Sequence, residues 1–146
     1  MSIIASNQEI LKILQENTSI AVLGSHKNKE KAAYYVPSYL KENDYKIYPV
    51  NPKYTADNLE LFGQEVVANL TDLEQKIDIV NVFRKSEHLE AHLEDILAMK
   101  HQPKLVWFQL GIKNDEIAQR LSEQGIDVVQ DKCMLAEHKR LIAKAS

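Results

Sequence analysis

Short apolar runs recur along this chain, and most are followed by a segment with the apolar spacing of a helix. The first run, from Ser19 to Leu23, consists of small and apolar residues and stops at Gly24. A short apolar run that stops at a glycine and precedes a helix is typical of a buried strand. The same pattern predicts strands at 19–23, 46–50, 77–82, 104–109 and 127–130, and a short edge strand at 65–68.

Amphipathic segments separate the predicted strands. Ser6 begins a capping-box pattern, which marks the start of a helix that ends near Asn17. Pro37 favours a late start or a kink in the helix predicted at 30–43, because proline inside a helix removes a hydrogen bond. Residues 54–64 have no regular pattern and are expected to form a loop. Further helices are predicted after Ser86, after Asn114 or Asp115, and at 134–145, with a one-turn helix at the capping-box pattern that begins at Thr71.

Alternation of strands and helices predicts right-handed βαβ units and a parallel sheet with helices on both faces. The expected fold class is therefore α/β, a Rossmann-like doubly wound sheet in three α/β/α layers. Counting strands from 19–23 and including 65–68 as the third, the expected order is 3-2-1-4-5, with the last strand beside the fifth. We expect one domain over residues 1–146, with residues 1–18 forming a helix that packs on it.

Composition excludes several classes of protein. A chain of 146 residues with 45% hydrophobic and 27% charged residues suits one ordinary globular domain. The net charge of −3 gives no global attraction to nucleic acid or to a membrane surface. No apolar run approaches the roughly 20 residues that span a bilayer. The single cysteine, Cys133, suits a reducing compartment, and we expect a cytoplasmic protein.

The chemistry is expected where three of the strands end. In the predicted order, the ends of the first, second and fourth strands meet at the switch point of the sheet, where open α/β sheets bind ligands. A glycine there lets backbone approach a ligand, and N–H groups at a helix start favour an anion. Each strand end carries at least one basic residue, which predicts a ligand with several phosphates. The candidate binding residues are Gly24, Ser25, His26, Lys27 and Asn28, then Asn51, Pro52 and Lys53, then Phe83, Arg84 and Lys85.

The kind of nucleotide follows from what these segments lack. A dinucleotide site normally has three glycines in the first loop, whereas Gly24 is the only glycine here. An NAD site also has an acidic residue at the end of the second strand, which grips the ribose hydroxyls. This chain has Lys53 in that region, and a lysine attracts a phosphate on the ribose. A phosphorylated ribose, as in coenzyme A or NADP, is the better fit.

Five strings in the chain together carry a resemblance to a known family. They are Val22-Leu23-Gly24-Ser25, Tyr48-Pro49-Val50-Asn51-Pro52-Lys53, Val82-Phe83-Arg84-Lys85-Ser86-Glu87, Val106-Trp107-Phe108-Gln109-Leu110-Gly111 and Asp131-Lys132-Cys133. In these strings, from about Ser19 to Leu141, the chain resembles the small bacterial CoA-binding proteins. Those are stand-alone Rossmann-like domains similar to the N-terminal domain of the succinyl-CoA synthetase alpha subunit.

The resemblance implies roles for the candidate residues. It implies that the loop after the first strand receives the CoA phosphates and that Lys53 binds the phosphorylated nucleotide end. It also implies that Phe83, Arg84 and Lys85 line the adenine or pantetheine side. The chain departs from the family in its first loop, which reads G-S-H where the family commonly has G-A-S, and at Met134, where the family has proline.

No set of residues in the sequence makes a nucleophile with a base and an orienting group. Cys133 and His138 lie close in sequence but lack an orienting acid at matched spacing. His88 and His92 have the spacing of a metal pair, but a solvated polar face explains them, so no metal is expected. We therefore expect binding without catalysis. An NADP-binding enzyme or redox sensor, and a protein-interaction module with a vestigial crevice, remain as alternatives, and no protein partner is identified.

Overall fold

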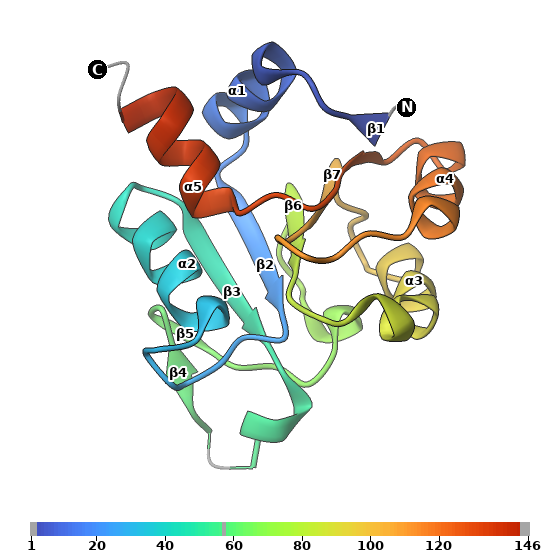
Figure 1. Ribbon diagram of the computed structural model, residues 1–146. Coiled ribbons are helices and arrows are strands. Elements are labelled where there is room, and N and C mark those ends of the chain that lie inside the picture. The colour runs from blue at the N-terminus through green and yellow to red at the C-terminus, as the bar shows by residue number, and fades with distance from the viewer. Residues whose placement is uncertain (1–2, 57, 144–146) are drawn as a thin grey trace.

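The computed structural model describes residues 3–56 and 58–143, and in this part of the chain six strands form one parallel sheet (Figure 1). The sheet has the order β1-β8-β7-β6-β2-β3, so β2 lies between β3 and β6. This arrangement confirms the Rossmann-like α/β fold. The strands are β1 (Ile3–Ile4), β2 (Ser19–Leu23), β3 (Lys46–Val50), β6 (Ile79–Val82), β7 (Leu105–Phe108) and β8 (Asp127–Val129).

Helices cover both faces of the sheet, because successive strand residues point to opposite faces and both faces are apolar (Figure 1). Trp107 packs on one face and Phe108 on the other, and both are fully buried. The Trp107 face is covered by α1 (Asn7–Glu16), α2 (Ala32–Glu42) and α5 (Met134–His138), which continues into a π-helical turn (Lys139–Ala143). The Phe108 face is covered by α3 (Leu89–Leu97) and α4 (Asp115–Glu123).

Both edges of the sheet differ from the expectation. The N-terminal residues Ile3 and Ile4 form β1, which pairs in parallel with β8, whereas only a helix was expected over residues 1–18. The predicted edge strand at 65–68 is wrong, because only Val67 bridges to Val50. The chain before it folds back on itself instead, since β4 (Glu60–Leu61) pairs with β5 (Gln64–Glu65) across a turn at Phe62 and Gly63 with φ of 57° and 82°. Local pairing across such a turn removes these residues from the main sheet.

Two helices begin at their predicted N-caps, and two other predicted helix starts differ in the structure. Ser6 accepts a hydrogen bond from the Glu9 N–H at 3.2 Å, and Asn114 accepts one from the Ile117 N–H at 3.0 Å, as predicted. The box expected from Thr71 begins instead at Asn69, and it caps a 3₁₀ turn (Leu70–Asp72). A second 3₁₀ turn (Ser86–His88) delays the start of α3 to Leu89.

A polar network holds α5 against α1 and α2. The Tyr39 hydroxyl lies 2.7 Å from Nδ1 of buried His138, and the Tyr45 hydroxyl donates to the Leu14 carbonyl. Both tyrosine rings meet the imidazole edge-on, with centroids 5.3 and 5.7 Å from it. Burial lowers the pKa of His138 and raises the pKa of Tyr45 to about 12. Both groups are therefore neutral in the folded protein at neutral pH.

No helix in the described residues combines the length and apolarity that crossing a bilayer requires.

The buried His138 predicts how stability changes with pH. Its pKa lies below the ordinary 6.5, so the unfolded chain takes up the proton at a higher pH than the folded protein. The free energy of unfolding should therefore fall as pH drops below about 6.5, and be unaffected by this residue above that pH. Urea denaturation from pH 7.5 to pH 5 should show a shallower fall for His138→Asn than for wild type. His101→Asn, at an exposed histidine, is the control and should keep the wild-type slope. Equal slopes for all three proteins would contradict this role.

Candidate functional site

The loop after β2 turns sharply around the end of β3. The N–H groups of Gly24 and Ser25 both donate to the Val50 carbonyl, at 2.9 and 3.3 Å. Gly24 has φ of +92°, a conformation that glycine adopts without the cost that a side chain adds. Ser25 is fully buried, and its hydroxyl donates to the Val22 carbonyl at 2.8 Å. Because these amides already have acceptors, an anion at this loop must meet side chains or amides further along.

His26 connects the loop after β2 to α2 and to Asn28 through hydrogen bonds. Its N–H donates to the Ala33 carbonyl in α2 at 3.2 Å, and its Nδ1 accepts the Asn28 N–H at 3.0 Å. The imidazole ring meets the ring of Tyr54 edge-on, with centroids 5.8 Å apart. Since Nδ1 is an acceptor, the neutral imidazole carries its proton on Nε2. Desolvation lowers the pKa of His26, and the positive charges of Lys53, Lys31 and Lys27 lower it further.

The segment after β3 is tied to this loop by a buried asparagine. The Asn51 amide donates to the Ser25 carbonyl at 2.8 Å, and its oxygen accepts the Lys53 N–H at 3.0 Å. This second bond caps a 3₁₀ turn (Pro52–Tyr54). Tyr54 then lies beneath two ammonium groups, with Nζ of Lys27 at 5.6 Å and Nζ of Lys53 at 5.8 Å from its ring centroid. Such contacts favour the positive charges without neutralising them.

Lys27, Lys31 and Lys53 are all exposed, and together we call them the lysine cluster. Each lies close enough to His26 to disfavour its protonation. None of the three makes an ion pair with a carboxylate among residues 3–56 and 58–143. A local positive field therefore exists on a chain whose net charge is −3.

The segment after β6 approaches the same glycine from the other side. The Phe83 N–H donates to the Leu23 carbonyl at 2.9 Å, which carries the strand pairing one residue further. A Cβ on Gly24 would lie 3.0 Å from the Phe83 oxygen and 3.3 Å from Nε of Arg84. That Nε is buried and has no hydrogen-bond partner among the described residues. Buried donors are almost always paired, so this Nε is available to a water or a ligand as a hydrogen-bond donor.

The eleven predicted residues lie at the ends of three adjacent strands, although they are not equally accessible. Ser25 and Asn51 are buried, and His26, Phe83 and Arg84 are half-buried. The exposed residues are Lys27, Asn28, Pro52, Lys53 and Lys85. The convergence of Gly24, Lys53 and Arg84 is present in the structure, while a ligand contact by any of the eleven remains a prediction. The sequence did not assign Lys31, Tyr54 or His92 to this group of residues. Burial lowers the pKa of His92, and the charge of Arg84 lowers it further. Tyr54 and Lys31 adjoin predicted segments in sequence, but nothing in the sequence brings His92 to Arg84.

The other candidate groups do not assemble. His138 contacts Tyr39, and Cys133 is the half-buried N-cap of α5, with no hydrogen bond from its thiol to a base in the described part of the chain. His88 is exposed and pairs with Glu87 at 3.6 Å. Within the described ranges, no three His, Cys, Asp or Glu side chains gather in a way that could hold a metal ion.

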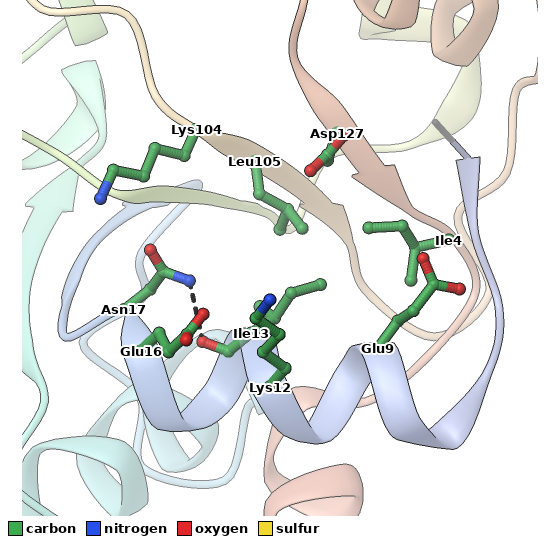
Figure 2. Close-up of a pocket in the computed structure, with 9 residues that line it drawn as sticks. All are labelled: Ile4, Glu9, Lys12, Ile13, Glu16, Asn17, Lys104, Leu105 and Asp127. Carbon is green, nitrogen blue, oxygen red and sulfur yellow. Dashed lines mark hydrogen bonds between the residues drawn. The ribbon is translucent and has the colours of Figure 1, made fainter. Parts of the chain in front are cut away.

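A hollow of about 390 Å³ lies at the opposite end of the sheet, between α1 and the first residues of β7 and β8 (Figure 2). Its rim includes the acids Glu9, Glu16 and Asp127 as well as the bases Lys12 and Lys104. This mixture gives no excess of positive charge for a polyphosphate. It also lies where the strands begin, away from the edge at which open parallel sheets bind their ligands.

Comparison with known proteins gives a consistent family. Residues 18–139 match the model of a CoA binding domain. The uncharacterized protein YneT of Bacillus subtilis (strain 168) is 37% identical over 133 residues, which are 91% of this chain and 94% of that protein. A Thermus thermophilus structure described as cell-free ID.343 is 46% identical, covers 94% of this chain and 100% of its own, and superposes with a TM-score of 0.88. An ADP-forming acetate–CoA ligase of Methanocaldococcus jannaschii is 36% identical over 69 residues, which are 47% of this chain and 9% of the ligase.

The close packing at Gly24 predicts that any side chain at this position lowers the free energy of unfolding. Gly24→Ala combines a positive φ with a Cβ 3.0 Å from backbone, so the backbone at Phe83 must shift. Gly111→Ala is the matched control, because Gly111 also has positive φ, +87°, but a Cβ would meet nothing within 4 Å. We expect Gly111→Ala to lower the free energy of unfolding by about 1 kcal/mol and Gly24→Ala by about 2–3 kcal/mol. Urea denaturation measures both, and equal losses would show that the approach of Phe83 costs nothing.

Proposed function

This chain belongs to the family of CoA-binding domains, and we propose that it binds coenzyme A or an acyl-CoA through the phosphorylated nucleotide end, without catalysis of its own. The observation that carries the proposal is the gathering of the lysine cluster and Arg84 around the Gly24 turn. CoA has a pyrophosphate and a phosphate on its ribose. Several cations without carboxylate partners in the described part of the chain are what such a ligand requires.

The residues present fit this group. Lys53 follows the strand whose end normally carries an acid for an unphosphorylated ribose, so it would hold the ribose phosphate. Lys27 is a mobile point charge, and Arg84 offers a buried Nε donor, so these two would hold the pyrophosphate. When bound, CoA supplies a thiol or thioester as the carrier of an acyl group.

The remaining predicted residues divide by accessibility. Phe83 and exposed Lys85 would line the adenine or pantetheine side. Buried Ser25 bonds the loop back to β2, and buried Asn51 bonds it to the segment after β3. His26 and Asn28 shape the turn through their mutual hydrogen bond, and exposed Pro52 begins the 3₁₀ turn that presents Lys53.

A panel of nucleotides tests the choice of ligand. CoA and acetyl-CoA at 100 times their dissociation constants should stabilise the fold by about 2.7 kcal/mol, which is a rise in Tm of several degrees. At the same concentration, NAD and ATP should give a smaller rise, because neither carries a phosphate on the 2′ or 3′ hydroxyl of its adenosine ribose. A shift with NADP but none with CoA would favour an NADP enzyme or redox sensor. No shift with any nucleotide would favour an interaction module.

Charge reversal tests the assignment of Lys53. Lys53→Glu should abolish the CoA-dependent rise in Tm while leaving the unliganded Tm nearly unchanged, because the side chain is exposed. Lys76→Glu makes the same change of charge at another exposed lysine, before β6, and should bind CoA as wild type does.

Dephospho-CoA separates the ribose phosphate from the rest of the ligand. Wild type should prefer CoA to dephospho-CoA, and Lys53→Ala should lose most of that preference. Isothermal titration calorimetry measures both constants, and a preference retained in Lys53→Ala would move the ribose phosphate to another residue.

A further inference from the structure

Pro37 lies inside α2, where it is buried and where the helix continues on both sides of it. In a regular helix, the N–H of residue 37 would donate to the carbonyl of residue 33. Proline has no N–H, so the Ala33 carbonyl loses its helical partner. A helix carbonyl left without its donor costs free energy unless another group pairs with it, which is one reason why proline is rare inside helices.

The missing donor is replaced by the candidate ligand loop. The His26 N–H donates to this same Ala33 carbonyl at 3.2 Å. The bond joins α2 directly to the residue that contacts Tyr54 and Asn28. Lys27 follows His26, so the direction of its side chain depends on the backbone that this bond fixes.

We propose that Pro37 is a positioning residue for the ligand loop: by leaving the Ala33 carbonyl free, it holds the 26–28 backbone in the conformation that binds the phosphates. This inference rests on the proposed function for the identity of the ligand, but the contact itself does not. An alanine at position 37 would supply an N–H that competes with the His26 N–H for the carbonyl. The helix would gain a regular hydrogen bond and the loop would lose its anchor.

The substitution Pro37→Ala therefore should change stability and binding in opposite directions. Its Tm should equal or exceed that of wild type, because alanine suits a helix interior far better than proline. In the unliganded protein, the His26 amide should exchange with deuterium about five- to tenfold faster, as expected for one lost hydrogen bond. The dissociation constant for CoA should rise by about the same factor, since the binding conformation is less populated.

Two further variants keep the result interpretable. Ser38→Ala changes the neighbouring position of α2 but keeps Pro37, so its Tm, its His26 exchange and its affinity for CoA should match wild type. Leu40→Ala creates a cavity at a fully buried position of the same helix and keeps the Ala33 carbonyl as it is. It should lower the Tm without weakening CoA binding as Pro37→Ala does.

The outcomes separate this inference from the proposed function. Unchanged His26 exchange and unchanged CoA affinity in Pro37→Ala would overturn the positioning role, whereas wild-type binding would still support the proposed function. Equal loss of affinity in Leu40→Ala would also overturn it, because general loosening of α2 would then be the cause. If wild type fails to bind CoA, the proposed function is wrong, and faster His26 exchange in Pro37→Ala still supports the anchoring of the loop.

Discussion

The site depends on one backbone constraint, the shared use of the Val50 carbonyl by the N–H groups of Gly24 and Ser25. These two bonds bend the chain as soon as β2 ends and bring its loop over the end of β3. The bend requires the positive φ of Gly24, and the absence of a side chain there lets Phe83 and Arg84 approach. The ends of β3, β2 and β6 are neighbours in the sheet, and the missing Cβ lets the segment after β6 pack against the turn after β2.

Two buried polar side chains then hold the turn after β2 in place. Buried Asn51 bonds the first loop to the second, and buried Ser25 bonds the turn back to β2. These groups have their hydrogen bonds satisfied inside the protein, so they cost little to bury. The residues that remain for a ligand are the flexible cations at the rim and the orphaned Nε of Arg84. A pre-formed backbone with mobile charges on it suits binding of phosphates, and no nucleophile beside a base is present among the described candidates.

The positive charge around His26 is a local feature of the chain. The chain as a whole is slightly acidic, yet Lys27, Lys31 and Lys53 all lie around His26. Desolvation, and then repulsion by these lysines, favours the neutral imidazole, which accepts the Asn28 N–H. The hollow beside α1 is enclosed by a mixture of acids and bases, so the presence of a hollow does not by itself identify the site.

The sequence by itself determined the α/β class, the order of the five strands from β3 to β8 and the three basic segments, because apolar periodicity and glycine or proline positions act locally. It also identified the caps at Ser6 and Asn114, which depend on residues three positions apart. Only the tertiary structure decided what depends on distant partners. The β1 strand exists because β8 offers it an edge. The expected strand at 65–68 is lost because Glu65 pairs with Glu60 and only Val67 bridges to β3. In the sequence, Pro37 predicted only a late start or a kink in a helix. The hydrogen bond from the His26 N–H to the Ala33 carbonyl, which Pro37 leaves free, joins two segments and is encoded by no local pattern.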